Sequence, residues 1–171
     1  EIYATSIDYN PKAEISIQFF KKVQNKIHYA IHGQTAAEVI YNRADAEKEF
    51  MGLTSFAGKQ PTLKEAVVAK NYLDEKELRA MGQLVSGYLD FAERQAEREQ
   101  AMTMQNWAEH LDRILTMSGE QLLIGNGSVS HKQAVDKATG EYRKYKAKTL
   151  SEVEKDYLDS IKILEQKTEK I

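Results

Sequence analysis

The sequence has 171 residues, of which 42% are hydrophobic and 29% are charged, a composition typical of one folded globular domain. The formal net charge of −2 gives no general attraction to nucleic acid or to an anionic membrane. The absence of cysteine excludes disulfides, thiol catalysis and cysteine-ligated zinc. No run approaches the roughly 18 apolar residues of a membrane helix, and no signal peptide is visible, so we expect a cytoplasmic protein that makes no membrane contact.

The first part of the chain predicts two helices joined by a tight turn. Asn10-Pro11 is a typical helix start, with Asn as the N-cap and Pro in the first turn. Apolar residues then recur at helical spacing as far as Ile31, and Gly33 is suited to end the helix. The next helix begins at a capping box, in which the side chains of Thr35 and Glu38 each bond the other residue's backbone N–H.

The same kind of start signal recurs along the rest of the chain. Thr103 is a further N-cap, and Gly119 is expected to end its helix. The remaining capping boxes are Thr62–Glu65 for a helix to about Leu73, Asp74–Glu77 for a long helix to about Gln100, Ser130–Gln133, and Ser151–Glu154 for the last helix.

Two segments lack a helical pattern. Residues 47–61 are interpreted as an ordered loop, with a short strand pair as the alternative, and residues 122–130 form a second loop. The prediction is an all-α fold, a single multi-helix domain of about six to seven helices with one ordered irregular loop.

Apolar residues near the C-terminus follow spacings of three and four, as in a narrow helical seam. We therefore divide the chain into a helical core domain, residues 1–148, and a C-terminal helix, residues 149–171. This helix either lies on its own domain or mediates self-association, which would make the protein a homo-oligomer. The seam comprises Leu150, Val153, Tyr157, Ile161 and Leu164.

The stretch "HYAIHGQTAAE", residues 28–38, carries the strongest hint of chemistry. His28 and His32 are four residues apart, as in helical metal sites, but Tyr29 stands where a zinc protease needs its glutamate. Helical geometry places both imidazoles away from the apolar centre of their helix. The candidate polar cluster is His28, His32, Glu38, Arg43 and Asp45.

A simpler interpretation explains the same residues without function. Histidines suit the end of a helix, where the dipole favours positive charge, and the capping box already accounts for Glu38. We predict no metal and no cofactor, and we assign no catalytic residue.

Residues 131–148 are rich in Lys and Arg, with tyrosines interleaved. This pattern is compatible with nucleic-acid contact, although a solvated helix face has the same composition. The candidate contacts are Lys132, Arg143, Lys144 and Lys146.

Several long segments of the sequence resemble the RhuM family of bacterial virulence-associated proteins over roughly residues 1–145. They are "EIYATSIDYNPKAE", "FFKKVQNKIHYAIHGQTAAEVI", "RADAEKEFMGLTSF", "YLDFAERQAE" and "MTMQNWAEHLDRIL". The resemblance implies an N-terminal DNA-binding-like region before Glu1, which is absent here, and it implies no established activity, cofactor or catalytic residue. At Gln34 the family often has His, so this chain departs from a pattern that would supply a third imidazole.

Two hypotheses of function follow. The first is a non-enzymatic interaction or oligomerisation module of a DNA-associated protein, with DNA contact through the absent N-terminal region. The alternative is an uncharacterised enzyme with a His/Glu/Asp site within residues 28–45.

Overall fold

The computed structural model describes residues 6–168, and within that range the chain is helical with no strand. The prediction of an all-α fold is therefore confirmed. The α-helices are α1 (Glu14–His32), α2 (Ala36–Arg43), α3 (Leu63–Ala66), α4 (Glu75–Glu97), α5 (Met104–Met117) and α6 (His131–Thr168), with 3₁₀ helices η2 (Glu49–Gly52) and η3 (Ala69–Tyr72).

Local start and stop signals set most of the helix boundaries. The predicted capping boxes at Thr35, Thr62 and Asp74 are formed, each with both of its hydrogen bonds. Thr103 is also an N-cap, and its box is completed by the side chain of Asn106. Gly33 ends α1 in the left-handed conformation, with φ of 72°, which glycine adopts without steric cost.

Three predicted helix boundaries are wrong. The helix α1 begins at Glu14 and not at Pro11, because the Asn10 side chain accepts the N–H of Lys12 in a local turn instead of capping a helix. The helix after Thr62 ends at Ala66, and η3 follows it.

The third wrong boundary is a separate last helix starting at Ser151, since α6 runs unbroken from His131 to Thr168. This span contains no proline and a single glycine, Gly140, so nothing in its sequence interrupts the helix.

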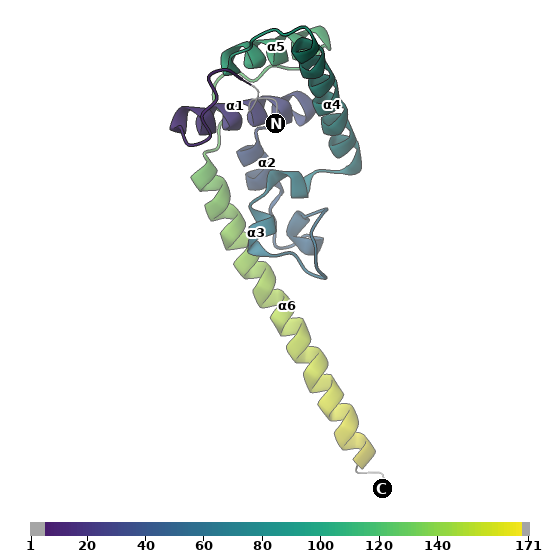
Figure 1. Cartoon of the computed structure of the whole chain (residues 1–171). Helices are drawn as coiled ribbons and strands as arrows, with labels where there is room; N and C mark the ends of the chain where they lie inside the picture. Colours follow the sequence, from purple (N-terminus) through teal and green to yellow (C-terminus); the bar gives the residue numbers. More distant parts are fainter. Residues whose placement is uncertain (1–5, 169–171) are drawn as a thin grey trace.

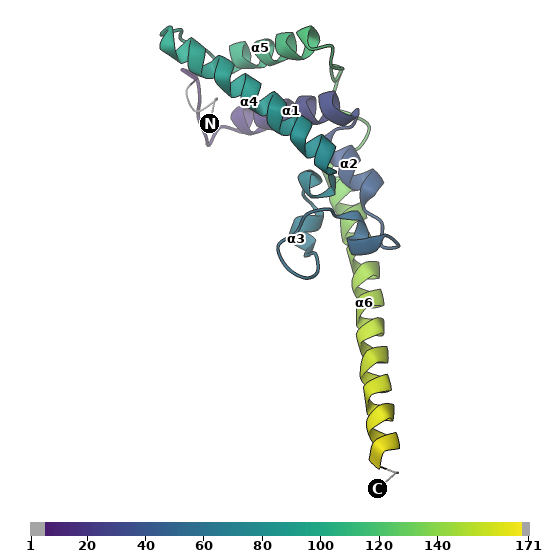
Figure 2. The same cartoon turned by 90° about the vertical axis from the view of Figure 1, so that its right-hand side faces the viewer.

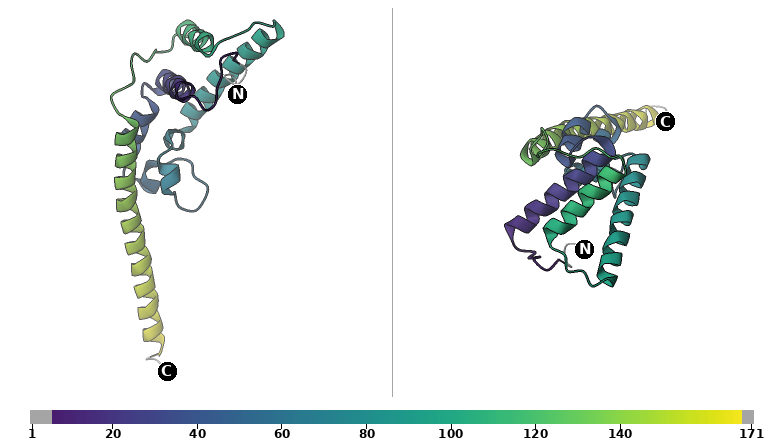
Figure 3. Two further views of the ribbon diagram at one scale, coloured as in Figure 1. Left: turned by 60° about the vertical axis from the view of Figure 1, so that its left-hand side comes forward. Right: turned by 90° about the horizontal axis from the view of Figure 1, so that it is seen from above.

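Two hydrophobic clusters divide the body into an upper and a lower lobe. In the upper lobe, α1, α4 and α5 lie beside one another (Figure 3). Their buried side chains include Trp107, Leu111 and Leu115. In the lower lobe, α2, α3, η2, η3 and the first part of α6 surround Met51 and Tyr72. The connection between α1 and α2 therefore passes from one lobe to the other.

The helix α6 begins in the lower lobe and then projects away from the body (Figures 1 and 2). Near its start, Ala134 and Ala138 are fully buried against the lower lobe. Farther along, Val153 and Tyr157 are 60% and 67% exposed. The contacts of described α6 side chains with the body thus lie in the first half of the helix.

One glycine in the lower lobe lies too close to the backbone to accept a side chain. Gly52 has φ of 90°, and a Cβ atom there would lie 2.4 Å from the carbonyl oxygen of Arg43. We expect Gly52→Ala to lower the free energy of unfolding by about 2–4 kcal/mol, because the backbone must shift at a strained φ. Chemical denaturation measures this change.

The matched control is Gly140→Ala in α6, where a Cβ atom would meet no neighbour within 4 Å. Alanine is the better helix former by roughly 1 kcal/mol, so this variant should be neutral or more stable. Equal destabilisation of both variants would contradict the steric explanation.

Candidate functional site

The two histidines lie on one face of the last turns of α1. The Nδ1 atom of His28 is 3.0 Å from the Nε2 atom of His32, and the ring centroids are 5.2 Å apart. Both residues are partly buried, and the Nδ1 atom of His32 is buried with no hydrogen-bond partner among the described residues. The rings therefore bond to each other, which requires at least one neutral imidazole.

Both rings are held in the neutral form. Burial, followed by the charges of His32 and Arg43, lowers the pKa of His28 to about 4, while Glu77 acts in the opposite direction. Burial also lowers the pKa of His32. At neutral pH the pair therefore acts as a polar contact without charge, and the expected effect of the helix dipole on a protonated histidine is outweighed by desolvation.

Arg43 and Glu77 form a two-pronged ion pair beside the histidines. The Nη1 and Nη2 atoms of Arg43 donate to Glu77 Oε2 at 2.7 Å and to Oε1 at 2.6 Å. Nη1 also donates to the carbonyl oxygen of Tyr72 at 2.9 Å. The Arg43 guanidinium holds the pKa of Glu77 at about 2. This pair joins the end of α2 to the first turn of α4, next to Leu78, which packs against the lower lobe.

Glu38 is fully occupied by backbone and hydroxyl donors. Its Oε2 atom accepts the N–H of Thr35 at 2.7 Å, and its Oε1 atom accepts the N–H and the hydroxyl of Ser128 at 2.6 and 2.8 Å. Burial acts to raise the pKa of Glu38, but the donors from Ser128 and Thr35 lower it. The carboxylate thus holds the start of α2 and the loop before α6 together.

Asp45 belongs to a different local structure. Its carboxylate accepts the N–H of Glu47 at 3.0 Å, and its backbone bonds Lys48 and Met51 in the turn that leads to η2. The structure thus gathers His28, His32 and Arg43 around Glu77, whereas Glu38 and Asp45 bond elsewhere. In the part of the chain that the structure describes, no three His, Asp or Glu side chains converge to hold a metal ion.

Sequence reasoning did not select Glu77 as a member of this cluster. Its one sequence signal is the capping box with Asp74, which is formed and in which Glu77 accepts the Asp74 N–H at 2.9 Å. Nothing local indicates its second partner, Arg43, which lies 34 residues earlier in the chain.

Many cations of the basic stretch are paired within the protein. Lys132 bonds Asp136 at 2.7 Å, and Lys144 bonds Glu141 at 3.2 Å. Arg143 and Lys146 are exposed and form no ion pair with described residues. Whether these residues contact nucleic acid stays a prediction.

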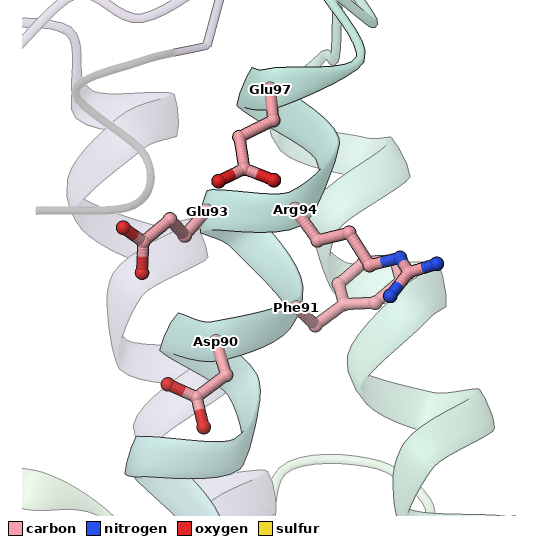
Figure 4. A pocket seen from close by; sticks show the side chains of 5 residues that line it. All are labelled: Asp90, Phe91, Glu93, Arg94 and Glu97. Carbon is pink, nitrogen blue, oxygen red and sulfur yellow. The ribbon is translucent and has the colours of Figure 1, made fainter.

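A shallow hollow on the upper lobe lies along α4 (Figure 4). Phe91 and Arg94 point toward α5, where the Phe91 ring packs against Trp107 and His110, whereas Asp90 and Glu93 point to the opposite side of the helix. Because the polar groups diverge, the hollow does not present a converging set of ligands. Its remaining lining residue is Glu97.

Comparison with known proteins gives one match. The model of the virulence protein RhuM family matches residues 1–153, which is most of the chain. Neither the curated proteins nor the solved structures yield a match. Among the described residues, no helix has both the length and the apolar character needed to cross a bilayer.

The lowered pKa of His28 predicts a pH dependence of stability. With a pKa of about 4 in the folded chain and about 6.5 in the unfolded chain, the unfolded state binds more protons between these values. Stability therefore falls as pH drops from 6.5 toward 4, by about 1–2 kcal/mol after allowance for partial exposure. Denaturation at pH 7 and pH 4.5 measures the loss.

The variant His28→Gln should lose less stability than the natural chain over that interval. Glu77, with its pKa of about 2, acts in a separate window, because its contribution is lost only as pH falls below about 4.5. Parallel loss in both proteins between pH 7 and 4.5 would assign the effect to other groups.

The Arg43–Glu77 pair predicts a larger effect of mutation. We expect Arg43→Ala to lower the free energy of unfolding by about 2–4 kcal/mol, because Glu77 and the Tyr72 carbonyl lose their partner in a partly buried site. The control is Arg79→Ala, which breaks an exposed i, i+4 pair with Glu75 on α4. It should cost less than about 0.5 kcal/mol, and a comparable cost for both variants would refute the special role of Arg43.

Proposed function

The chain belongs to the virulence protein RhuM family, and we propose that it is a non-enzymatic module. In this proposal two copies associate through the second half of α6. In this proposal residues 1–148 form the body and residues 149–171 form the associating arm. Residues 169–171 lie outside the described range.

The exposed apolar side chains of α6 carry the proposal. Val153 and Tyr157, which share one face, are 60% and 67% exposed on the part of α6 that projects from the body. Ile161 is partly buried. The side chains of Leu150 and Leu164, the other predicted members of the seam, are not among those described. A projecting helix with such a face is suited to pack against another helix.

Energetics also favours pairing of this segment. A helix in water gains most of its stability from packing an apolar face, and the second half of α6 projects away from the body (Figure 1). Burying one large apolar side chain contributes roughly 1.5–3 kcal/mol, while association costs about 4–15 kcal/mol. The few side chains of this seam therefore predict a pair whose formation depends on concentration.

The contacts at the candidate site support a role without catalysis. Glu38 and Asp45 are used in a cap and a turn, and both oxygens of Glu77 are bonded to Arg43. The alternative hypothesis of an enzyme needs these carboxylates to act on a substrate, and the geometry gives it no specific support.

The resemblance to the RhuM family implies a DNA-binding-like region, and we include this region in the proposal. A DNA-binding-like region preceding Glu1 would be held in pairs by the associating arm, because a two-fold pair suits two half-sites. The pairing of Lys132 and Lys144 with acids of the same helix is in keeping with a body that does not itself contact DNA.

The decisive variant is Tyr157→Lys, which places a charge in the centre of the exposed seam. We expect the natural chain to show a mass above that of a monomer in sedimentation or light scattering, rising with concentration. The variant should shift to the monomer, with a dissociation constant increased at least about tenfold, because burying an unpaired charge is unfavourable.

Asp159→Asn is the matched control. It changes the net charge by the same amount, and at about 100° per residue it lies on the opposite side of α6 from Tyr157. It should leave the mass unchanged. If the natural chain is a strict monomer at millimolar concentration while its circular dichroism shows it folded, the proposal is wrong.

A further inference from the structure

Resting on this proposed self-association, we infer that the partner of α6 is a second copy of the same helix running in the opposite direction. The two-fold axis passes beside Tyr157, so that each Tyr157 meets its equivalent. Val153 of one copy then faces Ile161 of the other. The contact is isologous, since the same surface serves both copies.

The spacing of the seam is the first argument for this direction. Val153 and Ile161 each lie four residues from Tyr157, on opposite sides of it, and the predicted members Leu150 and Leu164 each lie seven residues away. The spacing of the seam is therefore the same in both directions, and an antiparallel pair brings each seam residue level with another seam residue.

A parallel pair uses the same seam less well. A parallel heptad repeat that contains Val153 and Tyr157 at its core positions requires the next core residue three positions after Tyr157. That position is Ser160, whose hydroxyl donates to the backbone carbonyl of Asp156 at 2.7 Å. The apolar residue Ile161 would lie one position away from the core.

The acidic residue Glu154 beside the seam gives the second argument. Glu154 lies about 60° round the helix from Tyr157, and a parallel pair places it at the same level as its own equivalent, where like charges repel. In the antiparallel pair Glu154 lies level with Ser160 of the other copy. The two Glu154 residues are then offset by six residues, about 9 Å along the axis. The antiparallel direction also aligns the helix dipoles favourably.

The position of the body agrees with this arrangement. The body packs on the first part of α6, through Ala134, Ala138 and Glu141, whose carboxylate accepts the N–H of Ala46 at 2.8 Å. All of these residues precede the seam, and the second half of α6 extends beyond the body (Figures 1 and 2). An antiparallel pair therefore carries its two bodies at opposite ends of the paired segment.

Disulfide trapping tests the direction, and the absence of natural cysteine makes single-cysteine variants unambiguous. Chains with Val153→Cys and chains with Ile161→Cys, carrying different affinity tags, are oxidised separately and after mixing. We expect the mixture to form a disulfide between the two kinds of chain. Val153→Cys alone should link at least about tenfold less, because its equivalents lie eight residues or about 12 Å apart along the axis, beyond the ~7 Å between Cα atoms that a disulfide spans.

A second pair avoids any change to the apolar seam. Glu154→Cys and Ser160→Cys replace exposed polar residues that the antiparallel arrangement brings level. They should link after mixing, and neither should link alone to a comparable extent. This pair keeps the test valid if the Val153 or Ile161 variants associate weakly.

The outcomes separate the direction from the association itself. Efficient linking of Val153→Cys chains to each other would show a parallel pair and overturn the inference while leaving the proposed function intact. Linking in neither mixture, although light scattering shows that the variants associate, would overturn the proposed register. Monomeric mass for all variants and for the natural chain would instead reject the proposed function.

Discussion

The bond between Arg43 and Glu77 fixes the end of α2 to the first turn of α4, the helix that runs from the lower lobe into the upper lobe. Arg43 ends α2, and Glu77 lies in the first turn of α4, where Leu78 packs against the lower lobe. The later part of α4, with Tyr88, packs in the upper lobe. The planar guanidinium reaches both carboxylate oxygens and the Tyr72 carbonyl together, a geometry that lysine cannot reproduce. The histidine pair lies beside this ion pair and is partly buried. Burial disfavours the protonated imidazoles, so both rings are neutral at pH 7.

The parts of the fold that were predicted correctly are those whose causes are local. A capping box is settled within four residues, so Thr35–Glu38 and Thr62–Glu65 could be found without knowledge of the fold. The errors arise where local signals compete. Asn10 offers the same side chain to a turn as to a helix cap, and the turn is formed. Ser151 and Glu154 match a capping box, but a helix that is already propagating gains more by continuing through them.

In the candidate cluster, too, the local contacts could be predicted from the sequence and the long-range contacts could not. The histidine contact is an i, i+4 relation and was visible in the sequence. Glu38 was also explained locally, yet its second oxygen holds Ser128, 90 residues later, and no sequence pattern indicates that contact. Gly127 allows it, because a Cβ atom there would lie 2.6 Å from the Thr35 side chain. Long-range pairs such as these depend on packing and are set by the whole chain.

The unbroken α6 changes what the exposed seam can do. Had a new helix begun at Ser151, a flexible joint would separate the seam from the body. In the structure, the buried Ala134 and Ala138 fix the first half of α6 to the lower lobe, and the same helix continues to Thr168. A continuous helix transmits direction along its length, since its backbone bonds resist bending. Pairing at Tyr157 would therefore set the distance and the orientation between two bodies, and any further region joined to each body would inherit that geometry.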